Sequence, residues 1–177
     1  MIPSGDWLTP TRAVGLGAYG LGLACSAIAW ARSRAANGGS RLAAWLTALE
    51  SLLLVDMAVN GRWRLHDLLA GAAQQRHEYD LRRLPQSILV AVLIGVLFAG
   101  LIIALRFCRA RIGALLAVSG ALLSLVSWCI EVVSLHAVDA VLYRRVGIVM
   151  AISFVWIFAC LLTSAGILID SRRAQVP

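Results

Sequence analysis

The sequence predicts an all-α integral membrane protein with about five transmembrane helices in one bundle. Hydrophobic residues make up 60% of the 177-residue chain and charged residues 14%, whereas a soluble domain carries roughly 45–50% apolar and about 25% charged residues. The apolar residues form five runs, each near the roughly 20 residues that cross the hydrocarbon of a bilayer. Short groups of arginines stand at the ends of these runs, as is typical of the flanks of membrane spans. We expect one polytopic domain, 1–177, with spans at about 13–31, 42–60, 86–105, 112–133 and 146–169 and a polar outer loop at 61–84.

Each run has a signature of its own. The first is rich in Gly and Ala, which allows helices to pack closely within a membrane. The second contains two carboxylates, and the segment after it, RWRLHDLLAGAA, predicts a short interfacial helix. Pro85 opens the third run, because proline fits the first turn of a helix, and this purely apolar run is expected to face lipid. The helix of the fourth run could continue past Asp139, and the fifth ends before Asp170 and a basic tail.

The arginines indicate a membrane surface as the partner of the charged residues. The net charge is +7, and every basic residue is an arginine. Nucleic acid is excluded as a partner, because no basic stripe is interleaved with aromatic residues; contact with anionic lipid is expected instead. With the N-terminus outside, eight arginines fall on each side of the membrane. We expect this orientation, with a cytoplasmic C-terminus in a bacterial inner membrane, since the inner arginines lie in shorter loops with fewer acidic neighbours.

Carboxylates and histidines gather toward one end of the predicted bundle. The second and fourth spans run in the same direction and therefore end at the same face, the outer one. Glu50 lies eight residues into its span, where an ionised group costs roughly 2.5–3.5 kcal/mol at the helix centre. It should therefore face other helices, pair with a base or hold a proton. The side chains expected to converge in one outer-face cavity are Glu50, Asp56, His66, Glu131, His136 and Asp139, with Arg62, Arg64, Arg144 and Arg145 as ion-pair partners.

A weak internal repeat relates the second and fourth spans. Residues 42–62 align with residues 125–145 at an offset of 83 positions, with seven identities in 21 positions. The matched residues include a Trp, Asp56 with Asp139, and Arg62 with Arg145. Parallel repeats of this kind occur in small transporters, so the alignment places two aspartates at equivalent positions of the bundle.

These residues leave four functions open, and whether the chain is an enzyme is not decided. The favoured hypothesis is an accessory or assembly subunit of a membrane complex, in which the carboxylates form structural ion pairs. A second is a transition-metal or haem site. Four carboxylates and two histidines match the ligand inventory of di-iron bundles, although no E-x-x-H motif occurs. His66, His136 and one carboxylate would instead resemble a two-His, one-carboxylate site, and the two histidines could also ligate haem.

The remaining two hypotheses use the acidic residues directly. Asp56 and Asp139 could share a proton and activate water, as aspartic dyads do. Membrane-embedded aspartic peptidases such as the lipoprotein signal peptidase have a similar size, but the Asn- and Gly-rich surroundings of their aspartates are missing here, so this is an analogy. Alternatively, Glu50 and Asp56 could line a proton or cation path. Five spans are few for a transporter, so this function would require an oligomer or other membrane subunits.

Overall fold

The computed structural model describes residues 8–35, 40–75, 83–109, 111–133 and 136–173. These residues form seven helices and one small antiparallel hairpin. Five of the helices are long and apolar enough to cross a membrane, which confirms the predicted all-α bundle of five spans. They are α1 (Pro10–Ala35), α2 (Arg41–Val59), α4 (Arg83–Phe107), α5 (Ile112–Val133) and α7 (Ile152–Arg173).

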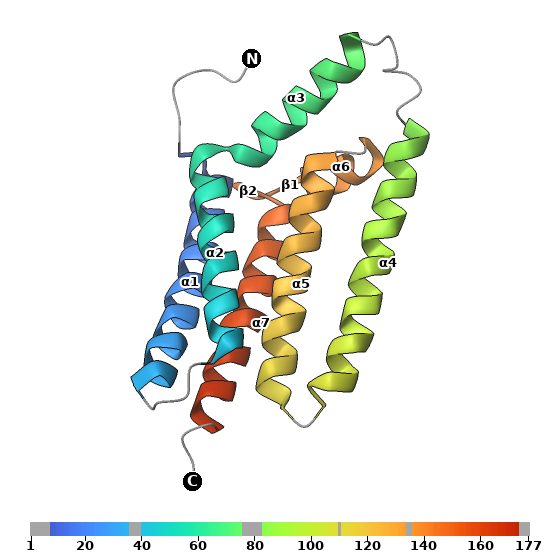
Figure 1. The fold of residues 1–177 in the computed structure, drawn as a ribbon. Helices are drawn as coiled ribbons and strands as arrows, with labels where there is room; N and C mark the ends of the chain where they lie inside the picture. The colour runs from blue at the N-terminus through green and yellow to red at the C-terminus, as the bar shows by residue number, and fades with distance from the viewer. Residues whose placement is uncertain (1–7, 36–39, 76–82, 110, 134–135, 174–177) are drawn as a thin grey trace.

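Four of the long helices pack together, and the fifth lies to one side (Figure 1). α1, α2, α5 and α7 form the packed group, whereas α4 leans on α5. Of the most apolar stretch of α4, 11% is buried, compared with 50% for α7. Because its side chains are apolar and mostly exposed, α4 is the helix best suited to face lipid, as its sequence predicts.

α2 and α5 run in the same direction and end together, at the end of the bundle that α3 (Gly61–Gln75) crosses obliquely (Figure 1). We call this the α3 end. Ser40 begins α2 by accepting a hydrogen bond from the Ala43 N–H at 3.3 Å. Asn60 ends it in the left-handed conformation, at φ 57°, which Asn tolerates better than most residues. The sharp turn at Asn60 starts α3, the helix expected after the second span.

The chain between α5 and α7 differs from the prediction. α5 ends at Val133, and α6 (His136–Leu142) is a separate short helix. β1 (Arg145–Val146) and β2 (Val149–Met150) then form a hairpin around Gly147, whose φ is 65°. The fifth span therefore begins at Ile152 rather than near residue 146, because a glycine turns the chain at that point. The two segments aligned by the repeat consequently have different shapes: α2 is one helix, whereas 125–145 is divided among α5, α6 and β1.

α5 and α7 approach each other along small residues. A Cβ atom on Gly113 would lie 2.5 Å from the backbone nitrogen of Asp170, and one on Gly120 would lie 2.5 Å from the Ala159 carbonyl oxygen. Gly166 of α7 faces the backbone of Ala117 in the same way. Membrane helices commonly associate through such small residues, since close backbone contact replaces the hydrophobic driving force that lipid does not supply.

Candidate functional site

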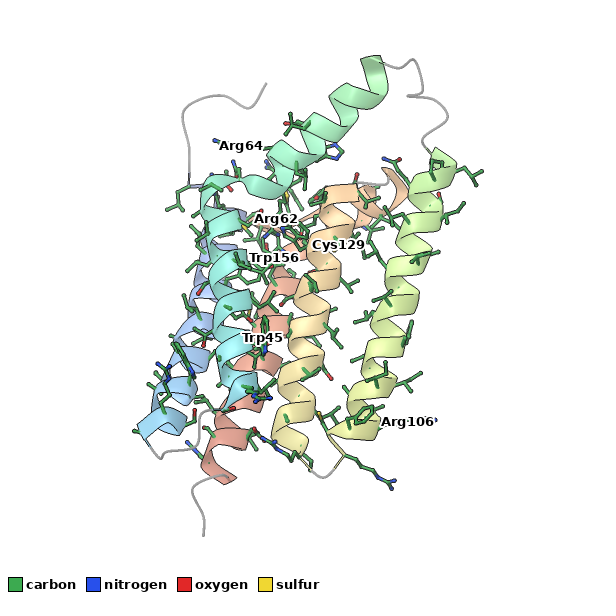
Figure 2. All side chains as sticks on the ribbon, in the orientation of Figure 1. Trp45, Arg62, Arg64, Arg106, Cys129 and Trp156 are labelled. Atoms are coloured by element: carbon green, nitrogen blue, oxygen red, sulfur yellow. The ribbon has the colours of Figure 1, made fainter. Side chains whose placement is uncertain are left out.

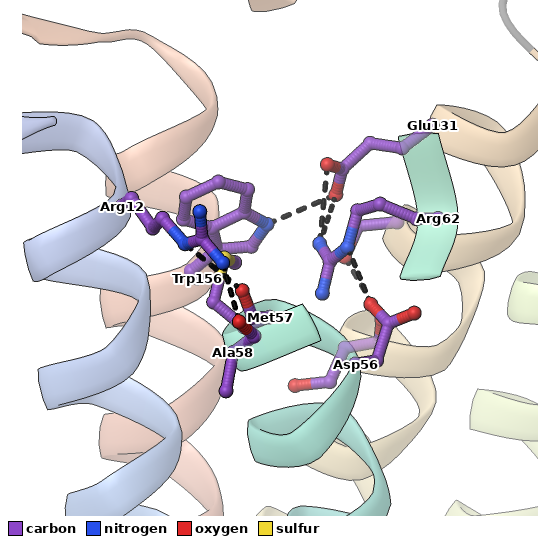
Figure 3. Close-up of polar contacts among 9 residues, drawn as sticks. Arg12, Asp56, Met57, Ala58, Arg62, Glu131 and Trp156 are labelled. Atoms are coloured by element: carbon purple, nitrogen blue, oxygen red, sulfur yellow. Dashed lines mark hydrogen bonds and ion pairs between the residues drawn. The ribbon is translucent and has the colours of Figure 1, made fainter. Parts of the chain in front are cut away.

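An ion-pair network joins three helices at the α3 end (Figure 3). Arg62, in the first turn of α3, donates through Nε to Asp56 at 2.7 Å and through Nη1 to the two carboxylate oxygens of Glu131 at 3.0 and 3.1 Å. Trp156 of α7 donates its indole N–H to the same Glu131 at 3.0 Å. The turn at Asn60 directs Arg62 back into the bundle, so one guanidinium ties the ends of α2 and α5 together.

This network is almost fully enclosed by protein. The exposed fraction is 1% for the side chain of Arg62, 0% for that of Glu131 and 15% for that of Asp56. The guanidinium carbon also lies 5.8 Å from the ring centre of Tyr19 and 5.4 Å from that of Trp156, within the range of cation–π attraction. Burial lowers the pKa of Arg62, but its neighbours, chiefly Glu131, raise it above its ordinary value on balance. Arg62 therefore remains a cation.

Arg12 supplies a second cation at the same end, and the sequence did not single it out. Its Nε donates to the Met57 carbonyl at 3.2 Å, and its Nη2 donates to the Ala58 carbonyl (Figure 3). These carbonyls belong to the last turn of α2, which has no intrahelical partners for its final oxygens. Arg12 thus joins the beginning of α1 to the end of α2. The one available signal was an arginine at the edge of an apolar run.

Glu50 lies deeper in the bundle and is surrounded differently. Its exposed fraction is 0%, and its carboxyl group packs against Gly22 of α1, where a Cβ would lie 2.8 Å from the carboxyl carbon. Cys160 of α7 points its sulfur at Oε2 from 3.9 Å. Among the described residues, Oε1 has no hydrogen-bond partner and no cation pairs with the carboxyl group. The structure therefore bears out the expectation that Glu50 faces other helices.

Buried polar residues extend from Glu50 toward both ends of the bundle. One face of α7 carries Ser153, Trp156, Cys160, Thr163, Ser164 and Asp170, all buried. Ser26 of α1 and Ser124 and Ser127 of α5 are buried on neighbouring helices. At the end opposite α3, Asp170 accepts two hydrogen bonds from Arg111, at 3.0 and 2.5 Å. The hydrogen bonds that Arg111 donates to Asp170, together with the negative charge of that carboxylate, raise the pKa of Arg111.

The remaining predicted site residues lie around the network at the α3 end. His66 places Nδ1 3.2 Å from the Val132 carbonyl oxygen, beside the end of α5. Asp139 lies in α6 near Tyr143; burial raises the pKa of Tyr143, and the charges of Glu131 and Asp139 raise it further. His136 begins α6, and its side chain falls outside the described residues. Arg64, Arg144 and Arg145 are exposed at this end, and Figure 2 shows Arg64 pointing away from the bundle while Arg62 points into it.

The positions of these side chains are relevant to two of the hypotheses, the metal site and the pair of aspartates that shares a proton. Within the parts of the chain that the structure describes, no three His, Cys, Asp or Glu side chains are grouped as metal ligands. A metal or haem site at His66 and His136 thus remains a prediction without a geometric observation in its favour. Asp56 is bound to Arg62 at 2.7 Å, so one of its carboxylate oxygens already has a cationic partner. This contact argues against a proton shared between Asp56 and Asp139.

Comparison with known protein families, curated proteins and solved structures finds no match to this chain. The function therefore has to be argued from the chemistry of the side chains themselves.

Proposed function

We propose that this protein carries protons within a membrane assembly, and that Glu50 is the group that takes up and releases the proton. One observation supports this proposal above all: Glu50 is a fully buried carboxyl group in the middle of a membrane bundle, and no cation among the described residues pairs with it. A buried carboxylate without a cation costs several kcal/mol, so such a group is expected to hold a proton. Intramembrane acidic residues of this kind commonly belong to proton relays.

The other buried carboxylates differ from Glu50 in this respect. Asp56 and Glu131 both bind Arg62, and Asp170 binds Arg111. In each pair the arginine compensates the charge of the carboxylate, and each pair connects two separate segments of the bundle. We therefore assign them a structural role and assign the proton to Glu50.

The polar face of α7 supports a route to and from Glu50. Cys160, beside Glu50, lies one helical turn from Trp156, which is about 6 Å along the helix axis, and Trp156 binds Glu131. In the other direction, Thr163 and Ser164 are followed by Asp170, which lies about 15 Å from Cys160 along the axis. Ser26, Ser153 and Ser164 carry buried hydroxyl groups with no partner among the described residues. Bridging water satisfies buried polar groups of this kind in membrane bundles and would connect them.

A second function, favoured by the sequence, is an accessory or assembly subunit of a membrane complex. The ion pairs support it, because each of them holds two helices together at an end of the bundle. α2 also presents exposed apolar side chains away from the bundle, including Trp45 at 76% exposure (Figure 2). In this case Glu50 would be a buried hydrogen-bonding group with no role in transport. For both functions we propose a bacterial inner membrane with the N-terminus outside.

Proton flux into liposomes tests the proposal. Purified protein is reconstituted with a pH-sensitive dye inside the vesicles, and a potassium diffusion potential drives protons inward. We expect the parent protein to conduct protons and Glu50→Gln, which keeps the shape of the side chain, to lose most of the flux. Asp67→Asn removes an exposed carboxylate from α3 and should leave the flux unchanged. A folded Glu50→Gln protein with full flux, or a folded parent without any, would overturn the proposal and leave the accessory subunit.

A further inference from the structure

Two adjoining hollows lie at the α3 end. One, of about 360 Å³, lies between the start of α1, the end of α2 and the first turns of α7, and Arg12, Trp63, Tyr143 and Trp156 line it. The other, of about 400 Å³, lies beside the hairpin, and Arg145 and Ile148 line it. Because Thr9, Thr11 and Met150 line both hollows, the two form one surface. We call this surface the interfacial cleft.

The cleft lies where the membrane spans end. α1 begins at Pro10, α2 ends at Val59 and α7 begins at Ile152, so we expect the cleft to lie near the boundary between hydrocarbon and lipid headgroups. Trp63 and Tyr143 form one wall, with ring centres 5.0 Å apart. Trp and Tyr are enriched at this depth, since their rings suit a boundary between apolar and polar surroundings.

The polar part of the cleft is suited to an anion. Among the described residues that line it are Arg12 and Arg145, and none of these residues is Asp or Glu. The N-terminal ends of α1 and α7 add partial positive charge. Thr9 Oγ1 accepts a hydrogen bond from the Arg12 N–H at 3.3 Å, and Thr11 Oγ1 accepts one from the Met150 N–H at 3.1 Å. A hydroxyl that accepts from a backbone N–H keeps its own O–H to donate, so both threonines can donate to a ligand.

We propose that the interfacial cleft binds the phosphate headgroup of an anionic phospholipid. Arg145 and the two threonine hydroxyls would receive the phosphate oxygens, because arginine and hydroxyl groups are the usual donors to phosphate. Arg12, whose Nε and Nη2 donate to the end of α2, would contribute its positive charge. Met57, Met150 and Ile152 form an apolar wall beside them, and this wall would contact the glycerol and the first part of an acyl chain. Since one side of the cleft is cationic and the other apolar, it fits a phosphate attached to a lipid better than a free phosphate ion.

Lipid-dependent stability tests this site. Delipidated protein in detergent is titrated with phosphatidylglycerol, with phosphatidylcholine of the same acyl chains, and with inorganic phosphate, and the unfolding temperature is recorded. A ligand that binds the folded protein raises this temperature. We expect phosphatidylglycerol to raise it at lower concentration than phosphatidylcholine, and inorganic phosphate to have little effect. Equal effects of the two lipids, or saturation by inorganic phosphate alone, would overturn the proposal.

A pair of neighbouring arginines locates the site. Arg145 lines the cleft, whereas Arg144 is also exposed but lines neither hollow. Arg145→Gln should weaken the apparent affinity for phosphatidylglycerol about fivefold, the effect of one arginine near an anionic surface, and Arg144→Gln should leave it unchanged. Equal losses in both variants would show a diffuse charge effect and reject the cleft. A phosphatidylglycerol analogue with a photoreactive headgroup should cross-link to residues 9–12 or 145–150, and exclusive labelling elsewhere would also reject it.

Discussion

Arg62 is the cation on which both neighbouring carboxylates depend at the α3 end. Arg62→Met would leave Glu131 buried without a cation, and removing one partner of a buried pair costs about 3–5 kcal/mol. We expect a lower unfolding temperature for this variant and recovery of most of the loss in Arg62→Met with Glu131→Gln, because the double change removes both charges. Asp56 is 15% exposed and can be solvated in the double variant.

Thermal unfolding in detergent measures this coupling. Arg64→Met is the matched control, since Arg64 is exposed two residues along the same helix, and it should change the free energy of unfolding by less than about 0.5 kcal/mol. Equal destabilisation in the single and double variants would show that the ion pair is not coupled. A chelator should leave all of these proteins unchanged if ion pairs alone hold this end together. Destabilisation of the parent protein by chelator would instead support a metal site at this end.

Substitutions at two glycines of α1 test whether the position of the Glu50 carboxyl group matters for proton flux. A Cβ on Gly22 would lie 2.8 Å from the Glu50 carboxyl carbon, whereas a Cβ on Gly20 would have no neighbour within 4 Å among the described residues. Gly22→Ala should therefore displace the carboxyl group and reduce proton flux, while Gly20→Ala should leave the flux at the parent level. The liposome assay compares the two variants. Equal flux in both would mean that the position of this carboxyl group does not matter for transport.

A hydrophobic carbodiimide provides a chemical test of the protonated state of Glu50. Such reagents modify a carboxylic acid in an apolar environment, and the reaction begins with proton transfer from the acid. We expect dicyclohexylcarbodiimide to modify Glu50 and to block proton flux. Mass spectrometry of peptides identifies the modified residue. Asp56, Glu131 and Asp170 should be modified less than Glu50, because an arginine already binds each of them; preferential modification of these three would contradict the assignment.

At the scale of helices, the contact between α5 and α7 depends on the absence of side chains at glycines. Gly166→Ala would place a methyl group against the backbone nitrogen of Ala117, and a backbone atom cannot move aside as a side chain can. We expect a loss of about 1–3 kcal/mol of stability, as for other overpacked interiors. Gly95→Ala on α4 is the control, since a Cβ there would have no neighbour within 4 Å in the part of the chain that the structure describes. Thermal unfolding of the two variants should differ clearly, and similar values would contradict the close approach.

The helices differ in how well the sequence could predict them. The five spans were predictable, because an apolar run of sufficient length has few alternatives to a membrane helix. The grouping of Asp56 and Glu131 followed from the parallel directions of their helices. The hairpin was not predictable, because four strand residues around Gly147 are too few to show alternation and apolar residues continue past them. The pairing of Arg111 with Asp170 was also missed, since a separation of 59 residues leaves no local signal.

At the scale of the whole molecule, the two ends of the bundle determine what topology experiments should find. α1, α4 and α7 end opposite to α3 (Figure 1). Reporter fusions after Ala36, Ala110 and Pro177 should therefore lie on one side of the membrane and a fusion after Gln75 on the other. We expect the first three to be cytoplasmic, because the arginines of that end lie in short loops next to the spans. Gln75 and Ala110 on the same side would contradict the bundle, and inverted results throughout would contradict only the orientation.

The order of the charged residues along the chain has a consequence for membrane insertion. Domains are made from the N-terminus onward, so Arg62 has already been synthesised when Glu131 emerges from the ribosome, and Arg111 has been synthesised when Asp170 emerges. Each late carboxylate thus enters a bilayer in which its cation is already waiting at the correct end. Glu50 has no such partner among the described residues, so under the proposed function we expect it to be inserted with its proton. Synthesis therefore places Glu131 and Asp170 after their cations, whereas Asp56 precedes Arg62 by six residues and Glu50 is expected to arrive as an acid.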